Sequence, residues 1–140
     1  MPTRMWGRRQ SLGSGLQVIQ IRYASHQNVG EGQPALAAYA DSGVYEQAGA
    51  PFEVTEPRMP AGVENAEPHV QLGALGGEIA NVIAEARRAG KAILMTGGNC
   101  SHAPGVLGGL QDAHGPGARI GLVWLDAHGD FNKLQTVYHP

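Results

Sequence analysis

The chain has 140 residues, of which 42% are hydrophobic and 16% are charged, and its formal net charge is −2. These values are typical of one globular domain, and they argue against a disordered chain and against a nucleic-acid-binding surface. No apolar run approaches the ~20 residues of a membrane span, so we expect no membrane partner. A single cysteine excludes an intrachain disulfide and fits a reducing, cytoplasmic compartment.

The first part of the chain predicts two strands that flank one helix. Residues 1–15 lack periodicity and are interpreted as a loose leader before residues 16–140, which form the N-terminal part of a single domain. In chain order we expect a β-rich strand at 16–23, a polar loop at 24–34, a helix at 34–48 that Gly43 bends or breaks, and a short strand at 51–56.

The second part predicts two further helix–strand units. A helix over 69–89 is indicated by one apolar stripe and ends at Gly90. A strand follows over 91–98, then a helix capped by Ser101 that continues to His114, and a last strand over 118–125. The stripe of the first helix consists of Leu72, Leu75, Ile79, Val82, Ile83 and Ala86.

This alternation of strands and helices favours an α/β fold with three α/β/α layers and a mainly parallel sheet. The strands at 91–98 and 118–125 are almost continuously apolar, as is typical of strands buried on both faces. In such sheets ligands bind at the carboxyl ends of the strands. We expect these two strands to be neighbours, so that the polar residues that follow each of them share one cleft.

Three metal-capable side chains follow the last predicted strand at every other position: Asp126, His128 and Asp130. In extended backbone, alternate side chains lie on the same side, and Gly129 lets the chain curl. Two carboxylates and an imidazole suit Mn²⁺, Fe²⁺ or Zn²⁺ in a site that is not a thiolate-rich structural zinc site. The alternative is that Asp126 caps a turn and that His128 is an ordinary loop histidine.

The turn after the strand at 91–98 has the sequence GGNCSH and presents Asn99, Cys100 and His102. Two glycines allow a sharp turn and a close approach to a ligand. The alternative is a plain strand-to-helix turn in which Ser101 is the N-cap and Cys100 is a small buried residue. A nucleotide-phosphate site is disfavoured, because neither this turn nor the loop at 24–34 carries a phosphate-binding fingerprint.

Together these two motifs resemble those of the ureohydrolase family, which includes arginase, agmatinase and formimidoylglutamase. In that family a GGDHS-like turn precedes a DAHxD motif, and here GGNCS and DAHGDFN stand in their places. The resemblance is good over 65–132 and holds in outline over 16–60. It implies an arginase-like fold that is truncated after the DAHGD strand, because the family's later S-x-D-x-D motif is not found.

The resemblance also implies ligands and roles. The family holds a pair of manganese ions, which Asp126 would bridge while His128 and Asp130 each bind one ion. Cys100 occupies the position of a histidine ligand, and its softer thiolate favours Zn²⁺ or Fe²⁺ over Mn²⁺. Asp126 and His128 would serve catalysis, in which a hydroxide attacks a guanidinium or amidine carbon. Asn132 matches a position near the far end of the substrate.

Two functions follow from these observations. The first is a binuclear, manganese-type hydrolase of guanidino or amidino C–N bonds, with a small substrate and with part of the metal site missing from this chain. The second is a degenerate, non-catalytic family member that serves as a binding or oligomerisation module, as the substitutions at Asn99 and Cys100 favour. In either case we expect a homo-oligomer, because an apolar last strand at the edge of a sheet invites pairing with another chain.

Overall fold

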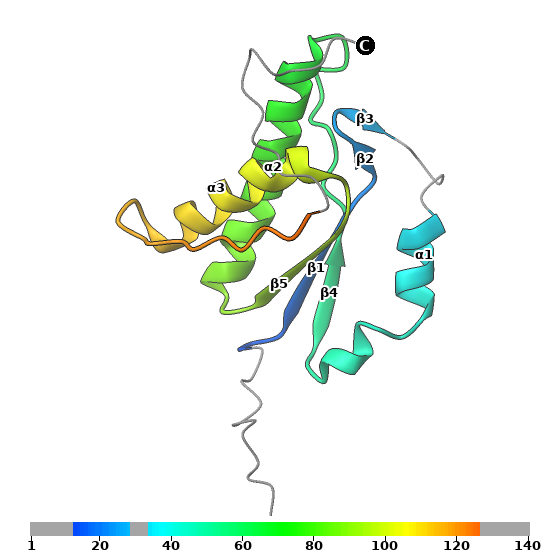
Figure 1. Cartoon of the computed structure of the whole chain (residues 1–140), viewed down its shortest axis with the longest axis vertical. Coiled ribbons are helices and arrows are strands. Elements are labelled where there is room, and N and C mark those ends of the chain that lie inside the picture. Colours follow the sequence, from blue (N-terminus) through cyan, green and yellow to red (C-terminus); the bar gives the residue numbers. More distant parts are fainter. Residues whose placement is uncertain (1–12, 29–33, 127–140) are drawn as a thin grey trace, which may run out of the picture.

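The computed structural model describes residues 13–28 and 34–126, which form one parallel sheet, a small hairpin and several helices (Figure 1). None of the helices in these residues is long and apolar enough to cross a membrane. The elements in chain order are β1 (Leu16–Ile21), β2 (Tyr23–Ala24), β3 (Gln27–Asn28), α1 (Pro34–Asp41), the 3-10 turn η2 (Glu46–Ala48), β4 (Phe52–Thr55), α2 (Pro68–Arg88), β5 (Ala92–Gly97), the 3-10 turn η3 (Cys100–His102) and α3 (Ala103–His114).

The sheet has the strand order β4-β1-β5, and both pairings are parallel. Val18 at the middle of β1 lies opposite Val54 of β4 and Leu94 of β5. Every residue of β1 is buried, as expected for a central strand that is covered on both faces. The prediction of an α/β fold with a mainly parallel sheet is therefore confirmed.

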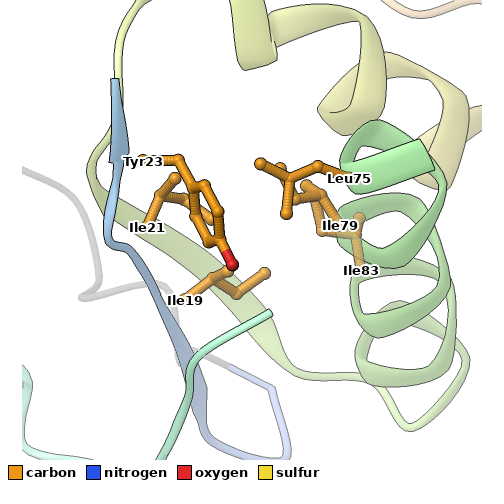
Figure 2. Packing of buried hydrophobic residues seen from close by; sticks show 6 residues of the cluster. All are labelled: Ile19, Ile21, Tyr23, Leu75, Ile79 and Ile83. Atoms are coloured by element: carbon orange, nitrogen blue, oxygen red, sulfur yellow. The ribbon is translucent and has the colours of Figure 1, made fainter. Parts of the chain in front are cut away.

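Helices cover both faces of the sheet and give the three predicted layers (Figure 1). Ile19 and Ile21 point to one face, where they pack against buried side chains of α2 (Figure 2). Leu16 and Val18 point to the other face and form a second cluster with Tyr45, just before η2. The alternation of side chains along β1 thus fills two separate apolar cores.

The apolar stripe of α2 was predicted correctly, and its central residues Leu75, Ile79 and Ile83 are fully buried against β1. The chain leaves the helix at Gly90, whose φ of 77° lies in the left-handed region. Here the Lys91 N–H donates to the carbonyl of Ala86, which satisfies one of the last helical acceptors. The helix therefore ends where its sequence indicated.

Glycines bring α2 and α3 unusually close together. A Cβ atom at Gly105 would lie 2.8 Å from the carbonyl oxygen of Gly76, and one at Gly109 would lie 2.6 Å from that of Ala80. Real Cβ atoms do not approach backbone oxygens this closely, so both positions require glycine. The two helices form one layer over the sheet because these small residues let their backbones meet.

Two predicted elements have different boundaries in the structure. The helix expected at 34–48 ends at Asp41, and Gly43, with a φ of 70°, lies in the turn that leads to η2. The loop expected at 24–34 begins with the hairpin of β2 and β3, whose turn places Ser25 at a φ of 59°. Such a turn depends on contacts with the rest of the fold, because serine rarely adopts this conformation unaided.

The predicted strand over 118–125 is wrong, because residues 115–126 contain no strand. The chain leaves α3 and runs beneath it (orange in Figure 1), and two hollows lie between this segment and β5. A strand forms only where a neighbouring backbone bonds its N–H and C=O groups, and this segment does not pair with β5. The side chains of Val123 and Leu125 are consequently 84% and 92% exposed. The expected adjacency of the two strands is therefore not found.

The close helix contact predicts the effect of one methyl group. Gly109→Ala should lower the free energy of unfolding by about 2 kcal/mol, because the new methyl would overlap backbone and core atoms. Gly108→Ala is a matched control in the same helix, since its methyl would meet only the Cβ of Ala80 at 3.9 Å. The control should gain about 0.5–1 kcal/mol from its higher helix propensity. Urea unfolding of the three chains tests this, and equal effects at both positions would contradict the packing.

Candidate functional site

The candidate site begins where β5 ends, at the carboxyl edge of the parallel sheet. Gly97 and Gly98 both have positive φ, 75° and 69°, which turns the chain sharply away from the strand. A Cβ atom at Gly98 would lie 2.8 Å from Nδ1 of His102 and 3.1 Å from Ile21. The double glycine therefore serves the turn itself, as the sequence indicated.

A capping box fixes the residues after the glycines. The Ser101 N–H donates to Oδ1 of Asn99 at 3.2 Å, and the Asn99 N–H donates to Nδ1 of His102 at 3.1 Å. Asn99 is thus the N-cap of η3 and His102 that of α3, so the prediction of Ser101 as the cap is wrong. Asn99 and Ser101 are both good caps by composition, and the position of the turn relative to β5 selects the asparagine.

His102 ties this turn to the hairpin that follows β1. Its side chain is 1% exposed, and its Nε2 lies 3.0 Å from the carbonyl oxygen of Ser25. Since a carbonyl accepts and the Asn99 N–H donates, the two contacts suit the tautomer that carries its proton on Nε2. The hydroxyls of Ser25 and Ser101 lie 3.3 Å apart beside them. His102 therefore holds two loops together and does not point to the open edge of the sheet.

The importance of Ser25 could not be found from the sequence. It lies in a polar stretch, ASHQN, that gave no signal beyond a loop. Its left-handed φ and its bonds to the turn after β5 appear only when β1 and β5 are aligned, with Ile21 opposite Gly97. The register between β1 and β5 therefore determines the contact between Ser25 and the turn after β5.

Cys100 and Asp126 line the same hollow, which has a volume of about 370 Å³. Cys100 is an exposed, free thiol, and the neighbouring Asn99 also lines the hollow. The rest of the lining is largely apolar and includes Val106 and Trp124. The structure thus brings together one residue from each of the two sequence motifs.

The other predicted site residues, His128, Asp130 and Asn132, lie outside the described residues. Within 13–28 and 34–126, no three His, Cys, Asp or Glu side chains are grouped closely enough to hold a metal ion. The described part of the site therefore offers two donors, the thiol of Cys100 and the carboxylate of Asp126. The metal-binding role of all these residues stays a prediction.

An ion pair fixes the neighbouring edge of the sheet. Arg22, which follows β1, donates two hydrogen bonds to Glu56, which follows β4, at 3.0 and 2.7 Å. These bonds hold the pKa of the Glu56 carboxyl below its ordinary value, and partial burial opposes the shift. Each side chain is 32% exposed, so solvent limits the contribution of the pair to less than about 1 kcal/mol. Its role is to align the carboxyl ends of two strands.

The parallel sheet, the glycine turn at its carboxyl edge and the acidic residue beside it define an α/β protein with polar residues at the carboxyl ends of its strands, which is where ligands bind in sheets of this kind. A sequence model of the arginase family matches residues 18–139, and the chain belongs to this family. The chain is also 33% identical over 85 residues to an arginase of Entamoeba histolytica. These matched residues make up 59% of this chain and 29% of that protein. The matched part therefore spans less than a third of the length of this curated relative. No solved structure matches the chain.

The contacts of His102 predict a structural role that can be measured. His102→Ala should lower the free energy of unfolding by about 2 kcal/mol, because the Ser25 carbonyl and the Asn99 N–H would both lose a partner. His69→Ala, an exposed position in the first turn of α2, is the control and should change stability by less than about 0.5 kcal/mol. Thermal unfolding compares the two variants. A neutral His102→Ala would show that the hairpin does not depend on this side chain.

Proposed function

We propose that this chain forms part of a metal-dependent hydrolase that cleaves guanidino or amidino C–N bonds in small substrates. The single observation that carries the proposal is that Cys100 and Asp126 line one hollow at the carboxyl side of the sheet. Its support is membership of the arginase family over 18–139, a range that includes the DAHGDFN motif. The curated relative that the chain resembles is called an arginase.

The donors available suit a divalent transition metal. Asp126 supplies a carboxylate and Cys100 a thiolate, and we propose that His128 and Asp130 add an imidazole and a second carboxylate. A mixed set of this kind fits Zn²⁺ or Fe²⁺ as well as the Mn²⁺ that carboxylates alone would favour. A metal held there would activate water for attack on an electrophilic carbon. Asn132, two residues beyond the last donor, is the proposed substrate contact.

The negative charge of the proposed ligands limits how many divalent cations they can bind. A binuclear site keeps two dications about 3.5–4 Å apart. Asp126, Asp130 and Cys100 carry at most three negative charges between them, which is less than the charge of the two ions. We therefore propose that residues outside this sequence complete the site of the active enzyme.

A specific observation favours a second function, that of a non-catalytic family member. Asn99 and Cys100 stand where the family turn has an acidic residue and a histidine, and Asn99 is engaged as a helix cap. A chain that had lost its metal would keep this turn for folding alone. Metal analysis of the purified chain, with and without the part that completes the site, separates the two functions, because only the hydrolase requires that metal binds.

The proposed compartment is the cytoplasm. Cys100 is exposed and is the chain's single cysteine. An exposed thiol stays available as a metal ligand only where the surroundings are reducing, since oxidation would convert it or link it to another chain.

The donor set predicts a change in metal preference. Cys100→His should bind Mn²⁺ more tightly relative to Zn²⁺ than the unmodified chain does, by roughly tenfold, because imidazole is a harder ligand than thiolate. Calorimetric titration of each chain with each metal measures this ratio. Asp126→Asn should weaken the binding of both metals, because it removes the carboxylate that shares the hollow with Cys100.

Asp112→Asn provides the matched control for the acidic position. Asp112 is exposed in α3 and pairs with Arg88, away from the hollow, so its loss should leave metal affinity unchanged. A shift toward Zn²⁺ in Cys100→His, or an unchanged ratio, would show that Cys100 does not bind the metal. Undetectable binding of either metal, also when the chain is extended by the residues that complete the site, would support the non-catalytic alternative.

A further inference from the structure

Cys100 lies in a turn that is too short to fix its own position. The turn η3 comprises three residues, and a 3-10 turn of this length has few hydrogen bonds of its own. The side-chain hydrogen bonds of the turn run through Asn99, Ser101 and His102, the neighbours of the cysteine. The position of the thiol therefore depends on how the backbone on either side of Cys100 is held.

Two contacts with the segment that follows β1 hold this turn on both sides of Cys100. Before the cysteine, the Gly98 N–H donates to the carbonyl of Ile21 at 3.1 Å. After the cysteine, Nε2 of the buried His102 lies 3.0 Å from the carbonyl oxygen of Ser25. Residues 21–25 therefore provide the support against which the turn is placed.

A chain of side-chain hydrogen bonds adds a further contact, and its direction can be deduced. The Ser101 hydroxyl donates its one proton to Oδ1 of Asn99, because an amide oxygen can only accept. The Ser25 hydroxyl, 3.3 Å from Oγ of Ser101, is therefore the donor to Ser101. These bonds run from Ser25 through Ser101 to Asn99, and they connect the hairpin of β2 and β3 with both neighbours of Cys100. Hydrogen bonds in such a chain strengthen one another.

Ser25 adopts a conformation that its hairpin turn does not favour in a serine. It is the first of the two residues that connect β2 and β3, and its φ of 59° is the only positive value of a non-glycine residue in the described part of the chain. A hairpin turn with positive φ at this position alone prefers glycine. A residue in an unfavourable conformation persists where the surrounding contacts impose it. The contacts of Ser25 with Ser101 and His102 are of this kind.

We propose that Ser25 is a positioning residue for the thiol of Cys100. Its hydroxyl and its carbonyl hold the turn after β5, and they thereby keep the thiol at the hollow that Asp126 also lines. The consequence for metal binding rests on the proposed function, whereas the positioning of the thiol does not.

Ser25→Gly separates positioning from stability. Glycine fits a positive φ better than serine does, and it retains the carbonyl that His102 contacts, so the midpoint of urea unfolding should be unchanged or higher. The variant loses the hydroxyl that donates to Ser101. A residue that serves the fold alone would then have no effect on the cysteine, whereas a positioning residue should release the thiol although the fold is retained.

The single cysteine of the chain allows a direct measurement of this release. A nitroxide spin label on Cys100 reports how freely this residue moves on the nanosecond timescale. The spectrum of the labelled, unmodified 140-residue chain should contain an immobilised component, and Ser25→Gly should lose it. Ser42→Gly is the matched control, because it removes a serine hydroxyl that donates to the Tyr39 carbonyl in the turn after α1. This control should leave the spectrum unchanged.

Cobalt titration of the unlabelled chains measures the consequence for metal binding. Ser25→Gly should raise the cobalt dissociation constant about threefold to tenfold, the effect expected of one lost hydrogen bond. Ser101→Ala removes the acceptor of the same hydroxyl, so adding Ser25→Gly to it should raise the constant no further. An unmodified chain that binds no cobalt would contradict the proposed function, and the spin label then decides the positioning role alone.

Three results would overturn the proposal. The first is a label that is as mobile in the unmodified chain as in Ser25→Gly, and the second is a label that Ser42→Gly releases to the same extent. The third is a release in Ser25→Gly that is accompanied by a lower urea midpoint, because lost stability would then explain it. If Ser25→Gly does not fold, the label in Ser101→Ala decides, since this variant removes the other hydroxyl of the pair.

Discussion

The alignment of β1 between β4 and β5 is the constraint on which the rest of this structure depends. β1 is buried on both faces and paired on both edges, so its register fixes where the neighbouring strands end. Ile21 lies opposite Gly97, and this brings the segment after β1 against the turn after β5. The bond between His102 and Ser25, the capping box at Asn99 and the position of Cys100 all follow from that match.

The turn after β5 divides structural and chemical roles among adjacent residues. Asn99 and His102 use their polar atoms to begin the helix and to hold the hairpin. Cys100 lies between them, exposed and lining the hollow that Asp126 also lines. Substitutions at Asn99 or His102 would therefore act first on folding, whereas a substitution at Cys100 would act on whatever the hollow binds. Among these turn residues, Cys100 is therefore the one that we propose as a metal ligand.

Local patterns predicted the elements that depend on the chain's own periodicity. The stripe through Ile79 and Ile83 located α2 because a helical spacing of apolar residues is sufficient to define a buried face. The prediction of a strand at 118–125 was wrong, because apolar composition indicates only that a segment needs a neighbouring strand and does not indicate where that strand lies. The choice of Asn99 over Ser101 as the cap, and the strained Ser25, depended on the register between β1 and β5, which no single stretch of sequence contains.

The central claim is that Cys100 and Asp126 bind one divalent cation together. Cobalt(II) provides the most direct measurement, because a thiolate bound to cobalt adds a charge-transfer absorption in the near ultraviolet, and the chain has only one cysteine. Titration of the purified chain with cobalt should produce this absorption, Cys100→Ser should abolish it, and Asp126→Asn should require more cobalt to reach it. No thiolate absorption in the unmodified chain, or an unchanged titration in Asp126→Asn, would contradict the account.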